Sequence, residues 1–340
     1  TISTVTITYS PRTVKTYFQC SGIGEYGPIS YNLPTAITLP DGSHYLFSYE
    51  PSPDPNYPSA VTGRIAQITL PTGGVISYDY SDGSNHGIIC SDGSASHLER
   101  TTSPGGQWIY ARRMVAGTNW ETTLTTPSDD TTVLNFQKVT TSEGTTYLET
   151  KRLTYSSPQT TLLQTTETCY NSGTPDCTGT SVFLPIDTRT VLNRMPDENG
   201  KTSKVVTQFS SSSGLPTQIR EYAFGAGSPG ALVRKTVINY APNISARPSS
   251  VEVFEGESTS VAKTLYTYDE GTPDVTNAPQ HEGVTTARGN LTKIERLVEG
   301  TTKYLTQSFT YFDTGMVHTS TDVNNSVTTY SYGDTCGNAY

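Results

Sequence analysis

A hairpin-like segment recurs in this chain, and its recurrence constrains the fold more than any other feature. The segment TLPDGSHYLFSYE, which starts at Thr38, aligns without gaps on TLPTGGVISYDYS, which starts at Thr69. In both copies a Pro-x-Gly turn precedes aromatic residues at alternate positions. Proline presets the φ angle that opens a turn, and glycine accepts the positive φ that follows. Alternation places the aromatic side chains on one face of a strand and the polar ones on the other. Each copy is therefore predicted to be a β-hairpin.

The same turn-and-alternation pattern occurs elsewhere in the chain. TTPSDDTTVLNFQ, which ends at Gln137, keeps the spacing with Asp129 in the glycine place. Near the C-terminus, Asn325 precedes Tyr330 and Tyr332 by the same intervals. Asn and Asp are the residues other than glycine that adopt the left-handed conformation most readily. Such repeats predict an all-β fold of extended antiparallel hairpins, each of which buries its apolar face against its neighbours.

Two shorter elements accompany the hairpins. One is an apolar residue, a spacer and a tyrosine; the other is leucine or arginine, a proline and a small hydroxyl residue. The copies are unevenly spaced, which indicates inserted loops over 270–287 and over the proline-rich stretch 51–61. In the best helix candidate, 291–298, the apolar residues fit a two-residue alternation as well as they fit a helical period, so no helix is predicted. The copies are Ile238-Asn239-Tyr240, Tyr266-Thr267-Tyr268, Phe309-Thr310-Tyr311 and Tyr330-Ser331-Tyr332 for the first element, and Leu33-Pro34-Thr35, Leu215-Pro216-Thr217 and Arg247-Pro248-Ser249 for the second.

Composition supports an ordered β-rich chain and excludes some partners. Hydrophobic residues make up only 33%, but the 22 Tyr, 9 Phe and 2 Trp are unlike a disordered chain. The net charge of −9, without a basic stripe, argues against nucleic acid and anionic membranes as partners. No apolar run approaches the ~18–20 residues that span a bilayer, so no membrane span is predicted.

The five cysteines allow a partial disulfide prediction. Cys169 and Cys177 flank the loop segment CYNSGTPDC, whose glycine and proline let the chain fold back, so a local bridge between them is plausible. Two unrelated thiols at the base of a loop are the alternative. Cys20 is a possible partner for Cys90, which would leave Cys336 over. Disulfides would fit an oxidising compartment.

The ends of the chain are interpreted as cuts through a longer polypeptide. The chain starts Thr1-Ile2-Ser3, without a charged lead into an apolar stretch, so a signal peptide is expected to be absent or removed. It stops at Tyr340, just after a strand pattern. We expect 1–340 to be one continuous β-repeat segment that is less regular over 138–204.

No metal or cofactor site is predicted. None of the histidines forms a two-His helical pair or a Cys/His cluster with zinc spacing. His86 and Cys90 share a loop with Asp82 and Asp92, but solvated loop residues are the better interpretation. The segments that start at Asp82 and Asp92 both read Asp-Gly-Ser and match no full calcium loop, which favours turns. The histidines are His44, His86, His97, His281 and His318.

No catalytic residue is predicted either, so the chain is expected not to be an enzyme. The carboxylate pairs at 129–130 and 197–198 lie in turn sequences, where aspartate is favoured for local hydrogen bonds rather than for glycosidase chemistry. Trp108, Trp120 and Tyr110 are candidates for stacking on sugars. Most tyrosines, however, occupy repeat positions where packing between strands is expected.

A further pattern links the elements to a known family. The unit Tyr-Asp, two residues, Gly, a polar residue and Leu or Ile resembles the repeat of the rearrangement-hotspot (RHS), or tyrosine–aspartate (YD), proteins. Tyr268-Asp269 begins such a unit, which resumes after the insertion at 288–294. The segment 311–317 is a close variant, and Tyr49-Glu50 with 63–65 is a copy split by a proline-rich loop. The resemblance is clearest over 30–137 and 205–340.

The resemblance implies a long antiparallel sheet coiled into a spiral, hollow shell or tube. In some proteins of this family the shell closes around a C-terminal toxin. Relatives include toxin-complex cocoon subunits, wall-associated bacterial proteins and the shell of teneurins. The aromatic residue of the repeat is expected to pack on the sheet, while the acidic residue and glycine help to set the hairpin. This chain has neither the self-cleaving core segment nor the toxin domain of the full pattern.

We therefore expect a non-enzymatic structural β-shell segment of a secreted or cell-surface bacterial protein. It would form a container, with an encapsulated toxin as one partner, or an extracellular tube or filament of copies joined end to end. The remainder of its own polypeptide is the other expected partner. The alternative is a cell-surface adhesive or carbohydrate-binding module, whose inserted loops would contact surface glycans. The sequence leaves container and filament both open.

Overall fold

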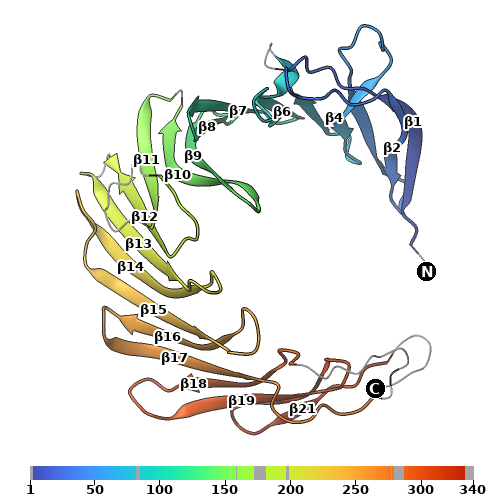
Figure 1. Ribbon diagram of the computed structural model, residues 1–340. Helices are drawn as coiled ribbons and strands as arrows, with labels where there is room; N and C mark the ends of the chain where they lie inside the picture. The colour runs from blue at the N-terminus through green and yellow to red at the C-terminus, as the bar shows by residue number, and fades with distance from the viewer. Residues whose placement is uncertain are drawn as a thin grey trace. The chain divides into compact units, whose positions relative to one another are not determined.

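The computed structural model describes residues 3–81, 85–157, 159–171, 181–196, 199–276, 278 and 287–333. Within these residues the chain forms 21 β-strands and one short 3-10 helix, η1 (Asn85–Gly87) (Figure 1). The predicted all-β fold of antiparallel hairpins is confirmed. The best helix candidate is a strand, β18 (Leu291–Leu297), because its partners on both sides hold it extended.

The chain divides into two compact units, Thr1–Thr166 and Glu167–Tyr340, here called unit 1 and unit 2. Unit 1 contains β1 (Thr6–Val14), β2 (Ile29–Thr38), β3 (His44–Pro51), β4 (Val61–Thr69), β5 (Val75–Asp79), β6 (His97–Ser103), β7 (Gln107–Ala116), β8 (Asn119–Thr125), β9 (Thr131–Thr141) and β10 (Gly144–Ser156), and β11 (Thr161–Tyr170) contains the boundary. Unit 2 continues with β12 (Thr188–Met195), β13 (Lys201–Phe209), β14 (Pro216–Ala226), β15 (Leu232–Tyr240), β16 (Pro248–Glu255), β17 (Thr259–Tyr268), β18, β19 (Tyr304–Tyr311), β20 (Val317–Thr321) and β21 (Val327–Thr329). The prediction of one continuous segment over 1–340 stays a prediction.

Strands pair antiparallel with their neighbours in chain order. In unit 1 the pairing runs from β1 to β10, and in unit 2 it runs from β12 to β21. Because direction alternates from strand to strand, all odd-numbered strands of a unit end at the same edge of its sheet.

The predicted hairpin turns all follow even-numbered strands, and we call the edge that they form the turn edge. Gly42 and Gly73 have φ of 83° and 84°, so both glycines adopt the positive φ that the turn requires. Asp129 and Asn325, predicted to replace glycine, have φ of 63° and 64°. Left-handed turn residues at these places are therefore confirmed, and their short polar side chains tolerate that conformation.

The opposite edge of each sheet, where odd-numbered strands end, is here called the loop edge. Connections after even-numbered strands contain three to six residues, the longest being 298–303. Every longer connection follows an odd-numbered strand: 15–28, 52–60, 80–96, 171–187, 241–247 and 269–290. The inserted loop predicted over 51–61, and the two ends of the one predicted over 270–287, therefore lie at the loop edge of their own units.

The registers sort side chains onto two faces, as the alternation predicted. In unit 1, Phe47 lies opposite Ile68, which lies opposite Ile76, whereas the neighbouring Ser48 lies opposite Gln67 on the other face. Unit 2 has one mainly apolar face with Ile219, Ile238, Val251, Val253 and Ile294, and one charged face with Arg220, Lys235, Glu252, Lys263 and Glu295. The ion pair Lys263–Glu252, at 2.9 Å, joins residues that are opposite one another on the charged face.

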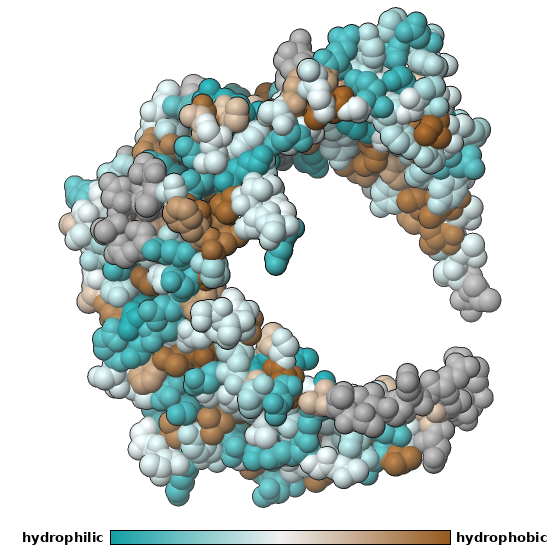
Figure 2. Space-filling model, in the orientation of Figure 1, coloured by the Kyte–Doolittle hydropathy of each residue, from teal (hydrophilic) through white to brown (hydrophobic). Residues whose placement is uncertain are grey.

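Few side chains are fully enclosed. Only nine of the described hydrophobic residues are buried, and Trp120 and Leu192 are the largest of them. On the surface that Figure 2 shows, hydrophobic side chains form separate patches among hydrophilic ones. Most apolar side chains of the strands are half-buried, because each is covered mainly by its neighbours in the same sheet.

Candidate functional site

The repeated structural unit at the loop edge is a joint built around an aromatic residue. At each joint a β-bulge in the strand pairing brings an aromatic residue opposite a residue of the next strand, here called its partner. The residue two positions before the partner has a positive φ. We call this arrangement the aromatic joint. The five joints, each given as aromatic, positive-φ residue and partner, are Tyr49–Gly63–Ile65, Phe209–Gly214–Pro216, Tyr240–Ala246–Pro248, Tyr268–Gly289–Leu291 and Tyr311–Gly315–Val317.

Tyrosine hydroxyl groups connect three joints of unit 2 to the joint before each of them. The Tyr240 hydroxyl donates to the carbonyl of Pro216 at 2.8 Å, and the Tyr268 hydroxyl donates to that of Pro248 at 2.9 Å. The Tyr311 hydroxyl continues the series to Leu291 at 2.8 Å. Each acceptor is the partner residue of the preceding joint, so a chain of hydrogen bonds runs along the loop edge of unit 2.

Unit 1 contains the same connection. The Tyr49 hydroxyl donates to Pro34, which lies opposite Tyr9 across another bulge, at 2.7 Å. The Tyr80 hydroxyl donates to the carbonyl of Ile65, the partner in the Tyr49 joint, at 3.0 Å. The apolar-x-Tyr and Pro-hydroxyl elements of the sequence are thus two halves of one contact, because tyrosine supplies the donor and the proline position supplies the acceptor.

Partial burial shifts the pKa of these tyrosine hydroxyl groups in the same direction. Desolvation raises the pKa of Tyr49, Tyr240 and Tyr268, because burial disfavours the phenolate. Burial likewise raises the pKa of Tyr80 and Tyr311. All five hydroxyl groups therefore stay protonated as donors at neutral pH.

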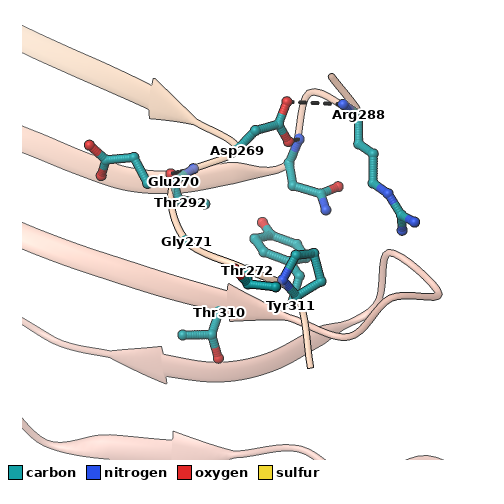
Figure 3. A pocket seen from close by; sticks show the side chains of 10 residues that line it. Asp269, Glu270, Gly271, Thr272, Arg288, Thr292, Thr310 and Tyr311 are labelled. Atoms are coloured by element: carbon teal, nitrogen blue, oxygen red, sulfur yellow. Dashed lines mark hydrogen bonds between the residues drawn. The ribbon is translucent and has the colours of Figure 1, made fainter. Parts of the chain in front are cut away.

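The acidic residue that follows the tyrosine holds the returning chain in both copies that carry a long insertion. Asp269 accepts hydrogen bonds from the backbone N–H groups of Arg288, Gly289 and Asn290, each at 2.9 Å. Figure 3 shows the bond from Arg288. Glu50 accepts from the Arg64 Nε at 2.7 Å and from the Thr62 hydroxyl at 2.6 Å. These carboxylates therefore fasten the far end of an insertion to the joint.

A pocket of about 230 Å³ lies at the Asp269 joint and is the one drawn in Figure 3. Asp269, Arg288 and Tyr311 contribute to its lining, together with the start of the insertion at 270–273. Its principal polar groups already have partners, because Tyr311 donates to Leu291 and the Arg288 guanidinium donates to the carbonyl of Asp313. The pocket is thus mainly a product of the joint and its insertion.

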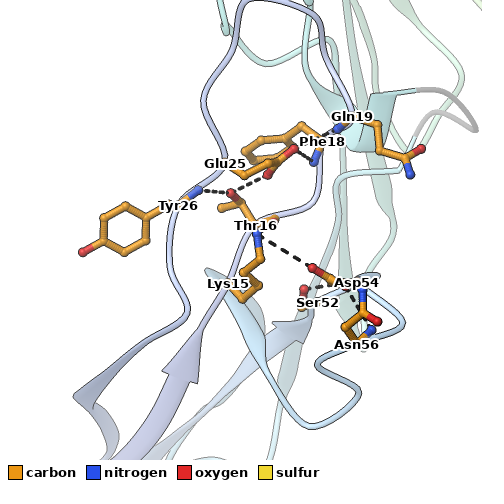
Figure 4. A network of polar contacts seen from close by, with 9 residues as sticks. All are labelled: Lys15, Thr16, Phe18, Gln19, Glu25, Tyr26, Ser52, Asp54 and Asn56. Carbon is orange, nitrogen blue, oxygen red and sulfur yellow. Dashed lines mark hydrogen bonds and ion pairs between the residues drawn. The ribbon is translucent and has the colours of Figure 1, made fainter.

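In unit 1 the long loops of the loop edge contact one another through a polar network (Figure 4). Lys15 and Asp54 are both buried, and the Lys15 Nζ lies 3.7 Å from the Asp54 Oδ2. Glu25 accepts from the Thr16 hydroxyl at 2.7 Å and from the N–H groups of Phe18 and Gln19. Partial burial opposes ionisation of Glu25, but these hydrogen bonds outweigh it and lower its pKa.

A disulfide and an arginine side chain also connect these loops of unit 1. Cys20 is bonded to Cys90, which confirms that pairing and removes Cys90 as a metal ligand. The Arg64 guanidinium lies over the ring of Tyr80 at 4.4 Å and that of Phe18 at 5.5 Å. Cys169 is also in a disulfide, but Cys177 and Cys336 lie outside the described residues, so the bridge between Cys169 and Cys177 stays a prediction.

Asp92 and Asp130, two carboxylates considered as site candidates in the sequence, already accept hydrogen bonds from other residues of the chain. Asp92 accepts from Ser94 and, at 2.8 Å, from the Tyr147 hydroxyl, as a turn residue does. Asp130 accepts from the N–H of Ser157 and from the Ser128 hydroxyl. Asp82, Gly83, Ser84, Asp197, Glu198 and His281 lie outside the described residues.

Trp120 was a candidate for sugar stacking, and the structure shows it to be inaccessible. Its side chain is 2% exposed, beneath the Arg112 guanidinium and against the edge of Tyr147. Trp108 is half-buried under Arg100, and Tyr110 is half-buried as well. Alternation alone did not reveal this, because the loop that carries Asp92 approaches the aromatic face from a distant part of the sequence.

No group of three or more His, Cys, Asp or Glu side chains gathers as a metal site in the part of the chain that the structure describes. Within the same residues, no helix has the length and hydrophobicity needed to cross a membrane.

Comparison with known proteins gives no family assignment. No family model matches the chain, and no curated protein matches it. Among solved structures it is similar to a chain of "Crystal Structure of TcdB2-TccC3-TEV", with 13% identity, a TM-score of 0.27 and coverage of 86% of this chain. It is also similar to a chain of "Crystal Structure of TcdB2-TccC3 without hypervariable C-terminal region", with 11% identity, a TM-score of 0.23 and coverage of 81%. The aligned part is 16% of the length of each of those chains.

Proposed function

We propose that this chain is a structural wall segment of a secreted or cell-surface β-shell of the rearrangement-hotspot type. The observation that supports it most is the series of aromatic joints in unit 2, in which the hydroxyl groups of Tyr240, Tyr268 and Tyr311 each bond to the partner residue of the joint before. A wall built in this way extends by adding hairpins, because every hairpin contacts only the hairpins next to it. The container around a toxin and the extracellular tube are the two forms that such a wall could take.

The role proposed is non-enzymatic. The acidic residues that follow the joint tyrosines, Glu50 and Asp269, accept hydrogen bonds from Arg64, Thr62 and backbone N–H groups. Carboxylates with full sets of donors are suited to holding loops rather than to exchanging protons with a substrate. A hydrolase activity of the purified protein that disappears in the variant Asp130→Asn would contradict this part of the proposal.

Electron cryo-microscopy of the native, full-length polypeptide tests the wall. We expect a hollow β-walled particle or a continuous β-walled tube, in which residues 1–340 form part of the wall. Density enclosed within a closed wall would identify the container, and a repeating open-ended wall would identify the filament. A compact particle without a β-wall would overturn the proposal.

A further inference from the structure

The aromatic joints share one geometry although the chain between their two sides differs greatly in length. The stretch from the aromatic to the positive-φ residue covers 312–314 at the shortest joint and 269–288 at the longest, three residues against twenty. The other three joints enclose 210–213, 241–245 and 50–62. In all five the aromatic residue lies opposite the residue two positions beyond the positive φ.

The bond that closes each of four joints joins its two sides, as the bond from the Leu39 N–H to Ser43 closes a turn-edge hairpin at 2.8 Å, so the bulge and its aromatic residue distinguish the joint from such a hairpin. The residue after the aromatic donates its N–H to the carbonyl of the residue before the partner: Ala241 to Arg247 at 2.9 Å and Asp269 to Asn290 at 2.8 Å. Ser210 donates to Leu215 and Phe312 donates to Met316 in the same way, each at 2.8 Å. The same bond thus closes loops of very different length.

The two edges of the sheet differ in what sets strand register. At the turn edge the turn itself fixes register, because hairpin register follows from turn type and loop length. At the loop edge, the bulge and the positive φ are present at all five joints whatever the loop contains, and the Tyr240, Tyr268 and Tyr311 joints also have the hydroxyl bond to the preceding joint. Closing a longer loop costs little more entropy, since that cost grows only with the logarithm of loop length.

We propose that the aromatic joint is an insertion site, at which the enclosed segment can be exchanged for one of another length without a change of strand register. The loop edge is then the margin on which this chain accommodates additional segments, and the turn edge is closed to them. This goes beyond the proposed wall function, because it concerns where the wall admits new sequence and holds for a container, a tube or any other assembly.

A matched pair of grafts in the full chain tests the proposal. Strand β15 has the five-residue turn-edge connection 227–231 before it and the seven-residue connection 241–247 after it, of which the joint encloses the five residues 241–245. One variant carries a copy of 269–288 in place of 241–245, and the other carries the same copy in place of 227–231. Native-state hydrogen exchange, read by mass spectrometry of peptides from β14, β15 and β16, is the measurement.

We expect the joint graft to keep the exchange protection of β15 and β16, and the turn-edge graft to lose at least tenfold in protection over β14 and β15. Equal retention in both grafts would overturn the proposal, because insertion would then be tolerated at either edge. Loss of protection in the joint graft would overturn it as well. A third variant, in which 269–288 is replaced by a copy of 241–245, is expected to keep the pairing of β17 with β18, and its loss would equally contradict the proposal.

Discussion

At the scale of single residues, Ala246 shows how the joint imposes its geometry on the sequence. Four of the five joints have glycine at the positive-φ position, whereas the Tyr240 joint has Ala246 with φ of 58°. A left-handed conformation costs a residue with a Cβ atom about 1–2 kcal/mol relative to the right-handed one. The sequence alone did not identify this position, because alanine carries no turn signal.

We predict that Ala246→Gly stabilises the protein by about 1 kcal/mol, since glycine adopts this φ without strain. Chemical denaturation of the full chain, followed through unit 2, measures the effect. The matched control is Gly214→Ala, because a Cβ atom there would meet nothing within 4 Å and only the φ of 67° is tested. That control should destabilise by a similar amount, and stabilisation by both substitutions would refute the argument.

The tyrosine hydroxyl groups make stability depend on alkaline pH. Burial raises the pKa of Tyr268 and of the four other bonded tyrosines, so the folded chain holds these protons more tightly than the unfolded chain does. Their contribution is complete below the ordinary tyrosine pKa of about 10 and is lost as pH rises through the folded values. We expect phenolate absorbance to rise together with unfolding above that pH.

Tyr268→Phe separates the hydroxyl bond from the ring. Removing the hydroxyl leaves the Pro248 carbonyl without this donor and should cost about 1 kcal/mol at neutral pH, while weakening the alkaline effect. Tyr304, in β19 but outside the hydroxyl series, serves as the control in Tyr304→Phe. Equal losses in the two variants would show that the series has no special role.

At the scale of elements, turns formed by neighbouring residues could be predicted from the sequence, whereas contacts between residues far apart in the chain could not. The turns at Gly42, Gly73, Asp129 and Asn325 were predicted because each lies within a few residues of its own alternating strands. The joint at Phe209 was missed, since it opens with a phenylalanine and encloses a run of serines that resembles an ordinary loop. The acceptors of the hydroxyl groups were also missed, because each lies fifteen or more residues away and depends on a bulge.

The carboxylate of Asp269 is predicted to hold the long insertion to the sheet. Asp269→Ala removes the acceptor of three backbone N–H groups and should cost about 2–3 kcal/mol. Hydrogen exchange should accelerate most at 287–291. Asp322→Ala, which removes a turn carboxylate that accepts from the N–H groups of Asn324 and Ser326, is the control and should leave 287–291 unchanged. Unaltered exchange at 287–291 in the first variant would refute the assignment.

The Cys20–Cys90 disulfide should stabilise the loop group of unit 1. The two cysteines are 70 residues apart in sequence, so the bond constrains a large part of the unfolded chain, and its loss should cost about 2–4 kcal/mol. The double variant Cys20→Ser with Cys90→Ser, compared with the parent chain by denaturation under oxidising conditions, measures this. We expect faster exchange at 15–28 and 85–96, and an unchanged midpoint would contradict the prediction.

At the scale of the whole molecule, contacts between neighbouring strands replace a common core. Leu192 is 1% exposed, yet most apolar side chains of the strands are only half-buried. Stability in such an architecture is close to a sum over adjacent units, so a local defect should stay local. The amphipathic sheet was predicted from alternation, but the division into two units was not, because no compositional boundary marks Thr166.

Leu192→Ala tests this locality and should cost about 3 kcal/mol through the cavity that it leaves. We expect exchange to accelerate in β12 and β13 while the strands β2 to β5 of unit 1 keep their protection. Val133→Ala, which alters a buried side chain of unit 1, provides the reciprocal control. Uniform acceleration in both units by either variant would indicate a single cooperative block and would refute the additive description.

The chain of tyrosine hydroxyl bonds also has a mechanical consequence. When the two ends of unit 2 are pulled apart, the hydroxyl bonds of Tyr240, Tyr268 and Tyr311 resist separation of the two strands of one hairpin each, at the end of the hairpin opposite its turn. A wall joined in this manner unravels stepwise from a free end, with a separate force peak for each pair of strands. Under load such a wall would open one hairpin at a time, and the hairpins that have not yet opened would stay intact.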